Sequence, residues 1–227
     1  MSVSDGAILS MIDHAVLAPD STHDDVLEGC ALASEAEVAS ICVHPFWVEV
    51  AAERLRESSV VVGTVVGFPF GATTADTKAY EARDAVRNGA DELDMVIALT
   101  ALRSGLTDAV RADIAAVVGA AYAADIEQPV VKVIIETCYL TEQEKRTAVK
   151  LAVDAGADFV KTSTGFGPEG ATVEDVSLLR ELTPEQVGVK AAGGIRSAQR
   201  AREMIEAGAS RIGTSSTRAI AEELGLL

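Results

Sequence analysis

The sequence predicts an α/β fold, a (β/α)₈ TIM barrel in which residues 1–227 form a single catalytic domain. Three observations favour this class. The length and the 48% hydrophobic content suit one substantial core. About eight apolar runs alternate with helical patterns. A Gly-Ala motif recurs between them, as expected of a repeated unit. An open, doubly wound parallel sheet is the alternative, because pattern alone does not show closure.

The apolar runs predict the strands. "VVVGTVVGF" and "VVKVIIET" are nearly continuous and β-branched, which is typical of parallel strands buried on both faces. The expected strands cover residues 12–17, 39–44, 60–67, 92–98, 130–136, 157–162, 187–192 and 210–213.

Helices are predicted between these runs. Thr141 and Glu144 have the spacing of a capping box, which marks a helix start. The Gly-Ala motif occurs in "RNGADELDMVIA", "DAGADFVKTS" and "EAGASRIGTS". Each copy is interpreted as a helix, a glycine cap, a short loop and a strand, since glycine adopts a left-handed backbone cheaply.

Composition excludes several classes of function. A net charge of −16 disfavours binding to nucleic acid phosphates. The sequence contains no run of about 18 apolar residues, so no membrane span is expected. No basic leader precedes the first apolar stretch, which argues against a signal peptide. Three cysteines fit neither a disulfide framework nor a zinc site, which favours a reduced cytoplasm.

Lysines stand where core residues are expected. Lys132, Lys161 and Lys190 all fall inside predicted strands, near Asp94 of another strand. A single strand lysine is usually a structural residue paired with a carboxylate, but three in one barrel indicate a charge-balanced interior site. Residues i and i+2 share a face, so Glu92 should point with Asp94, and Glu136 with Lys132.

A buried lysine beside a second cation suits Schiff-base chemistry. Keeping an amine uncharged at neutral pH in water costs about 4–5 kcal/mol. Burial and a neighbouring ammonium both lower the pKa and together supply that amount. One lysine then attacks a carbonyl while a nearby aspartate moves protons.

Glycine and serine residues after the later strands predict a phosphate site. A lone Gly-Gly is more often a plain turn, but loops after strands seven and eight are the recurrent phosphate site of these barrels. The residues concerned are Thr164, Gly165, Gly167, Gly193, Gly194, Ser197, Gly213, Ser215 and Ser216.

Eight segments together resemble the deoxyribose-phosphate aldolases, class I aldolases with the (β/α)₈ fold. They lie in family order along essentially the whole chain, and the sixth is the most specific. The segments are "IDHAVL", "ICVHP", "VVGFPFG", "ELDMVI", "VKVIIET", "VKTSTGFG", "VKAAGGIR" and "RIGTSS".

The resemblance implies reversible cleavage of 2-deoxy-D-ribose 5-phosphate to D-glyceraldehyde 3-phosphate and acetaldehyde, in deoxynucleoside catabolism. It implies no metal and no organic cofactor, small-molecule partners only, and a homodimer or homotetramer. By match, Lys161 forms the Schiff base, Lys190 perturbs the pKa of Lys161, and Asp94 relays protons. Phosphate and substrate residues follow: Gly165, Gly193, Gly194, Gly213, Ser215, Ser216, Asp13, Cys42, Thr162 and Lys132.

The chain departs from the family pattern at several places. Ala15 stands where many relatives have threonine, and Phe166 where some have a lysine near the phosphate. The chain stops at "EELGLL", without the terminal tyrosine of some members, so water is expected to serve in proton transfer. Because Phe166 replaces that lysine, phosphate binding is expected to depend more on backbone amides and Arg196.

Two other functions remain open at this point. One is a different phosphate-binding barrel enzyme, such as an isomerase or decarboxylase, with lysines as electrostatic clamps. The other is a sugar-phosphate binder without catalysis. His14 and His44 are expected to pack or hydrogen-bond at strand ends rather than act as bases.

Overall fold

The computed structural model describes residues 4–123 and 129–227. Within them, eight parallel strands form a closed barrel in chain order, and β8 pairs with β1. The strands are β1 (Ile12–Val16), β2 (Ser40–Val43), β3 (Val61–Val66), β4 (Glu92–Val96), β5 (Val130–Ile134), β6 (Phe159–Lys161), β7 (Gly188–Ala192) and β8 (Arg211–Thr214). The predicted barrel is therefore confirmed, and the open sheet is wrong.

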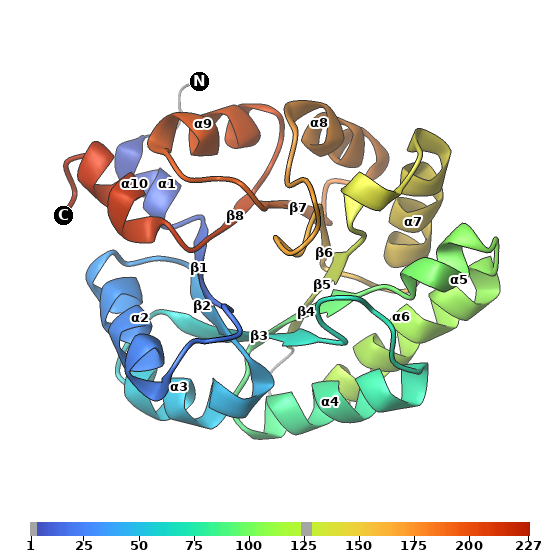
Figure 1. The fold of residues 1–227 in the computed structure, drawn as a ribbon, viewed down its shortest axis with the longest axis horizontal. Helices are drawn as coiled ribbons and strands as arrows, with labels where there is room; N and C mark the ends of the chain where they lie inside the picture. Colours follow the sequence, from blue (N-terminus) through green and yellow to red (C-terminus); the bar gives the residue numbers. More distant parts are fainter. Residues whose placement is uncertain (1–3, 124–128) are drawn as a thin grey trace.

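Helices surround the barrel, as Figure 1 shows in a view down its axis. They are α1 (Asp5–Leu9), α2 (His23–Glu35), α3 (Val48–Leu55), α4 (Ala75–Arg87), α5 (Leu99–Arg103), α6 (Thr107–Tyr122), α7 (Glu142–Asp154), α8 (Val173–Leu182), α9 (Ala198–Glu206) and α10 (Thr217–Glu223), with 3₁₀ turns η1 (Pro45–Trp47) and η2 (Thr137–Tyr139). In the described part of the chain, no helix is long and apolar enough to cross a membrane.

Local sequence explains where the helices begin and end. The predicted capping box is present at α7, where Thr141 and Glu144 each bond the backbone of the other. The glycine of each Gly-Ala motif has a positive φ just past a helix end: 103° at Gly89, 88° at Gly156 and 112° at Gly208. Residues other than glycine rarely adopt a positive φ, so the motif fixes the turn into β4, β6 and β8.

Alternation along the strands separates core from site. On β5, Val131 and Val133 belong to the apolar core that the helices cover, whereas Lys132 between them faces the barrel interior. The interior is therefore free to hold polar side chains without disturbing the packing outside it.

Candidate active site

A cavity of about 620 Å³ opens at the carboxyl ends of the strands. This is the end of the barrel where chemistry is expected. Residues after β1, β6, β7 and β8 form most of its wall. Its lining includes Asp13, Ala15, Leu17, Cys42, Lys161, Gly165, Phe166, Lys190, Gly193, Gly194, Arg196, Gly213 and Ser215.

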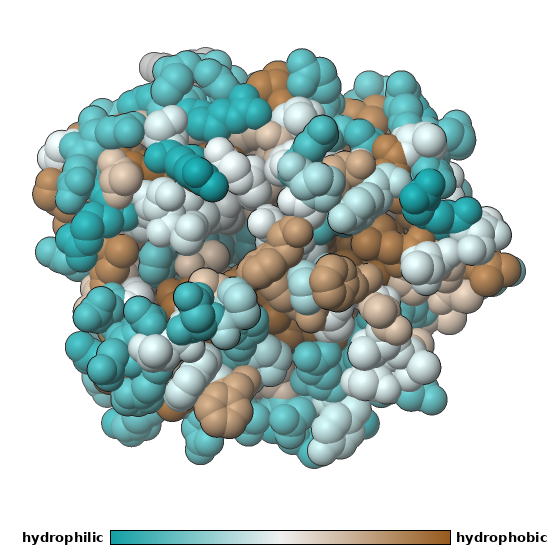
Figure 2. All heavy atoms as spheres, viewed as in Figure 1, coloured by the Kyte–Doolittle hydropathy of each residue, from teal (hydrophilic) through white to brown (hydrophobic). Residues whose placement is uncertain are grey.

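Hydrophobic side chains border this end of the molecule. Figure 2 shows hydrophobic groups near the centre of the face seen in Figure 1. Two of the strand-end loops expose Phe70 and Phe166, and the ring of Phe166 stands edge-on to Phe68 at 5.3 Å between centroids. The ring of Phe166 also lines the cavity, beside its polar residues.

Lys161 and Lys190 converge on one carboxylate. They are register partners on β6 and β7, so their side chains leave the same face. Lys161 Nζ lies 2.5 Å from Asp94 Oδ2, and Lys190 Nζ lies 2.7 Å from the same oxygen. Both lysines are buried and both line the cavity. The arrangement is the one that the Schiff-base hypothesis requires, with two amines on one side of the barrel wall.

The pKa values of the two lysines move in opposite directions. Burial lowers the pKa of Lys161, and the charge of Lys190 lowers it further against the pull of Asp94. Burial opposes the charge on Lys190 as well, but Asp13 and Asp94 raise its pKa above the ordinary value. Lys161 is therefore the amine that is more easily deprotonated, and Lys190 is the one that keeps its proton.

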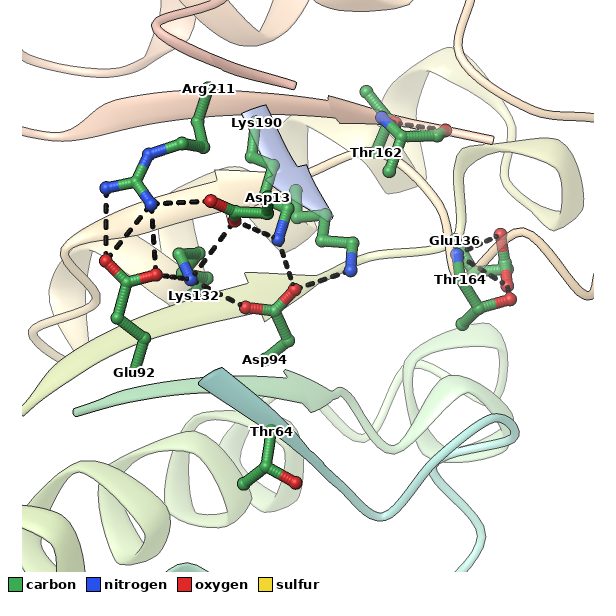
Figure 3. A network of polar contacts seen from close by, with 12 residues as sticks. Asp13, Thr64, Glu92, Asp94, Lys132, Glu136, Thr162, Thr164, Lys190 and Arg211 are labelled. Atoms are coloured by element: carbon green, nitrogen blue, oxygen red, sulfur yellow. Dashed lines mark hydrogen bonds and ion pairs between the residues drawn. The ribbon is translucent and has the colours of Figure 1, made fainter. Parts of the chain in front are cut away.

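Further charges lie below this pair, toward the amino ends of the strands (Figure 3). Lys132 Nζ is 2.5 Å from Glu92 Oε2 and 3.0 Å from Asp94 Oδ1. Asp13 forms ion pairs with Lys190 and with Arg211. Because β8 and β4 lie on opposite sides of the barrel, the pair between Arg211 and Glu92 spans its interior.

We call these seven side chains the interior charge cluster. They are Asp13, Glu92, Asp94, Lys132, Lys161, Lys190 and Arg211. Four are basic and three are acidic, so full ionisation leaves one net positive charge. An uncharged Lys161 makes the cluster neutral, which favours the free amine in this buried setting.

The glycine loops lie beside the lysines at the cavity. Gly165, Gly193 and Gly194 have φ values of 88°, 89° and 76°. A Cβ on Gly170 would lie 2.2 Å from the carbonyl oxygen of Gly193, so the loops after β6 and β7 touch through their backbones. Ser197 caps α9 by accepting from the N–H of Arg200. These loops place backbone groups and the exposed Arg196 at the cavity, an arrangement that can bind an anion.

Asp94, which both cavity lysines contact, does not itself line the cavity. Neither do three of the ten residues matched to phosphate and substrate binding. Lys132 is buried within the interior charge cluster, one layer below the lysine pair. Thr162 bonds the carbonyl of Ala192 and accepts from its N–H, which joins the ends of β6 and β7. The N–H of Ser216 donates to Thr214 Oγ1 at 2.9 Å. These three residues support the site from beneath or beside it.

Glu136 is a correction to the predicted alternation. β5 ends at Ile134, and Glu136 has a left-handed backbone with φ of 52°. Its buried carboxylate accepts from the N–H of Thr164 at 3.2 Å and from the hydroxyl of the same residue. Figure 3 shows it beside Thr164, away from Lys132. Period-2 reasoning failed here because the strand had already ended.

The thiol of Cys42 and the imidazole of His14, which line the cavity, are uncharged at neutral pH. Burial raises the pKa of Cys42 to about 11. Burial, aided by Arg218, lowers the pKa of His14 to about 4, and His14 Nδ1 bonds Thr217 Oγ1. His44 Nε2 bonds the carbonyl of Leu17. The predicted hydrogen-bonding role of both histidines is confirmed. Among residues 4–123 and 129–227, no group of three or more His, Cys, Asp or Glu side chains is placed to hold a metal ion.

The sequence analysis did not predict the positions of two charged residues. Arg211 is the first residue of β8, and its position in the sequence is typical of a charged residue beside a strand. Its side chain nevertheless lies within the interior charge cluster. Lys78 lies on a helix and is fully buried against Asp113. A helical period marks a face, but it does not show which distant residue meets that face.

Fold and cavity together define a (β/α)₈-barrel enzyme whose site is built from buried lysines and carboxylates. The chain belongs to the DeoC/LacD family of aldolases, whose family model matches residues 7–223. It is therefore an aldolase, a carbon–carbon lyase.

Individual relatives agree with this family. The deoxyribose-phosphate aldolase of Brevibacillus brevis is 55% identical over 205 residues, which cover 90% of each chain. Among solved structures, a putative deoxyribose-phosphate aldolase from Coccidioides immitis has a TM-score of 0.95 and 38% identity, covering all of this chain and 88% of that one. The deoxyribose phosphate aldolase of Aeropyrum pernix, described as tetrameric, has a TM-score of 0.90 and 32% identity, covering 98% and 92%.

Proposed function

We propose that the chain reversibly cleaves 2-deoxy-D-ribose 5-phosphate to D-glyceraldehyde 3-phosphate and acetaldehyde through a covalent imine at Lys161. The observation that carries this proposal is the shared counter-ion. Lys161 and Lys190 both contact Asp94 Oδ2, and both border the cavity. Relatives that are 51–55% identical are named deoxyribose-phosphate aldolases, which gives the substrate.

Imine formation uses the difference in acidity between the two lysines. The free amine of Lys161 attacks the aldehyde carbon C1 of the open-chain sugar, and a proton passes from nitrogen to oxygen through Asp94. Lys190 then donates a proton to the resulting hydroxyl, which leaves as water. The product is a positively charged iminium, and Asp94 stays beside it as counter-ion.

Carbon–carbon cleavage follows from the iminium. The amine of Lys190 takes the proton of the C3 hydroxyl, the C2–C3 bond breaks, and its electron pair forms an enamine on C2. Glyceraldehyde 3-phosphate leaves. Protonation of C2 restores the iminium, and water releases acetaldehyde while the proton returns to Lys190. The two lysines and Asp94 thus supply both the electron sink and the proton path.

The phosphate is assigned to the glycine loops. Gly165 lines the cavity in the loop after β6, and Gly193 and Gly194 line it between β7 and α9. Gly213 and Ser215 line it at the end of β8, and the lining also includes Arg196. Backbone amides at such loops bind anions. Binding energy from this remote group positions C1 against Lys161.

The wider setting is part of the proposal. We place the enzyme in the cytoplasm, in deoxynucleoside catabolism, with small sugar phosphates and aldehydes as its partners. A homo-oligomer is supported by the tetrameric description of the Aeropyrum pernix relative. The net charge of −16 supports the absence of a nucleic acid partner.

Reductive trapping tests the proposed function. The protein is mixed with acetaldehyde and cyanoborohydride, and digested peptides are mapped by mass. We expect an N-ethyl adduct at Lys161, and no adduct there in Lys161→Leu. Lys78→Met serves as the matched control, because it removes a buried lysine that does not line the cavity. An unmodified Lys161 in an active preparation would falsify the assignment.

A further inference from the structure

Arg211 lies at the end of the barrel that is remote from the cavity mouth. It is the first residue of β8, and its side chain is 16% exposed. Its Nη1 is 2.6 Å from Asp13 Oδ1 and 3.0 Å from Glu92 Oε2, and its Nη2 is 3.1 Å from Glu92 Oε1. The guanidinium also stands over the ring of Phe159 at 5.4 Å. Four contacts therefore hold one cation in a fixed orientation.

An unbroken series of ion pairs joins Arg211 to Lys161. The carboxylate of Asp13 is shared by three cations, with Oδ1 on Arg211 and Oδ2 on Lys190 and Lys132. Lys190 next contacts Asp94 Oδ2, which also faces Lys161. A change of charge at Arg211 therefore reaches Lys161 through shared carboxylates, without direct contact between the two basic groups.

Charge balance indicates how the loss of Arg211 would change the protonation of Lys161. With Lys161 uncharged, three cations face three carboxylates. Without Arg211, the carboxylates would face only Lys132 and Lys190, and protonating Lys161 would restore balance. In this buried cluster an uncompensated carboxylate is costly. Loss of Arg211 should therefore stabilise the ammonium form of Lys161.

We propose that Arg211 is a positioning residue that fixes the charge balance of the interior cluster from below and so keeps Lys161 available as an uncharged nucleophile. This inference rests on the proposed function. It extends the site to the amino end of the barrel, beyond every group that touches the substrate.

Other titratable groups lie beside this series of ion pairs. Lys132 and Glu92 lie between Arg211 and Asp94 and share the same ion pairs. Cys42, from β2, keeps its proton near neutral pH. Glu136, beyond β5, is held by Thr164. Arg211 is the cation of the cluster that does not also contact Asp94.

The test follows the pH dependence of adduct formation at Lys161. The rate of trapping with acetaldehyde and cyanoborohydride is measured from about pH 5 to pH 9 in the parent, Arg211→Met, Arg211→Lys and Glu92→Gln. The midpoint of the acid limb is expected to rise by about one unit or more in Arg211→Met. Arg211→Lys keeps the charge and should return the midpoint toward the parent value. Glu92→Gln removes a carboxylate and should lower the midpoint.

The double variant Arg211→Met/Glu92→Gln removes one charge of each sign. Its midpoint should return to within about 0.3 unit of the parent value. It also carries the test if Arg211→Met does not fold, by comparison with Glu92→Gln. A purely structural role for Arg211 would lower the trapping rate at every pH and leave the midpoint in place, and that result would overturn the inference.

The parent protein separates failure of this inference from failure of the proposed function. If the parent forms no adduct at Lys161, the proposed function falls and the inference falls with it. If the parent forms the adduct and the midpoint is the same in a folded Arg211→Met, the inference alone is wrong.

Discussion

Two buried lysines of this barrel look alike until their surroundings are compared. Lys78, on α4, and Lys161, on β6, are 0% and 3% exposed. Each ammonium lies within 2.7 Å of a carboxylate. Burial is the main cause that lowers the pKa of each. By burial and pKa alone, both would be candidate nucleophiles.

The difference lies in their partners and access. Lys78 lies outside the barrel and donates to Asp113 Oδ2 and to the carbonyl of Val96, and Asp113 also accepts from the N–H of Ala98. Lys161 shares its carboxylate with Lys190 and Lys132 and borders the cavity. A lowered pKa therefore marks a nucleophile only where the counter-ion is shared and a substrate can reach the nitrogen.

The largest expected effect is the loss of Lys161. Lys161→Leu should lower kcat for cleavage by roughly 1,000-fold or more, because the nucleophile is removed. The free energy of unfolding should change by less than about 1 kcal/mol, since Asp94 keeps two ammonium partners. Steady-state kinetics and urea unfolding check the two values, and substantial retained activity would remove Lys161 from the mechanism.

Lys78 should give the reverse result. Lys78→Met leaves Asp113 buried without its cation and should reduce the free energy of unfolding by about 3–5 kcal/mol. The kcat of the folded fraction should match the parent. The double variant Lys78→Met/Asp113→Leu removes both charges and should recover most of the stability. If Lys78→Met kept full stability but lost kcat, the distinction between the two lysines would collapse.

Lys190→Met tests the shared counter-ion itself. Without the neighbouring ammonium, Asp94 pulls harder on Lys161, so the pKa of Lys161 should rise by about 1–3 units. Below that pKa the amine is protonated and inactive, so the acid limb of kcat/KM should move upward and activity should survive best at high pH. Binding of inorganic phosphate to the folded variant is the control. Loss of Lys190 as proton donor and acceptor should also lower the rate at every pH, so the result that would contradict this account is an acid limb that stays at the parent midpoint.

The smallest expected effect concerns the hold of Glu136 on the loop after β6. Thr164→Val removes the hydroxyl that donates to Glu136 and accepts from the N–H of Phe166. Because this loop carries Gly165, losing these hydrogen bonds should weaken substrate binding by about 1–2 kcal/mol. The KM for 2-deoxyribose 5-phosphate should then rise roughly 5- to 30-fold. The KM for unphosphorylated 2-deoxyribose should stay near the parent value. Thr164→Ser keeps the hydroxyl and should behave as the parent; an equal rise for both sugars would argue against a phosphate loop.

Much of the fold could be predicted from the sequence. β-branched runs fix the strands, and the glycines at 89, 156 and 208 fix the helix ends. The lysine pair could also be predicted, because two strand lysines in one barrel must share a face when their strands are neighbours in register. These are local properties, and their repetition favours a barrel, whereas its closure is seen only in the structure.

Contacts between remote elements could not be predicted in the same way. Lys78 meets Asp113 because α4 and α6 pack together after different strands. Arg211 meets Glu92 across the barrel. Glu136 left its expected face because its backbone turned left-handed. In none of these cases does the period of the sequence show which distant residue a side chain meets. Helix packing decides it for Lys78, closure of the barrel for Arg211, and the end of β5 for Glu136.

The contact between Gly170 and Gly193 divides the cavity wall into rigid and adaptable parts. Any side chain at residue 170 would strike the Gly193 carbonyl, so redesign for longer or bulkier aldehydes has no room along that seam. The rim after β1, where Ala18, Pro19 and Asp20 are solvent-exposed, is the region where new specificity can be built.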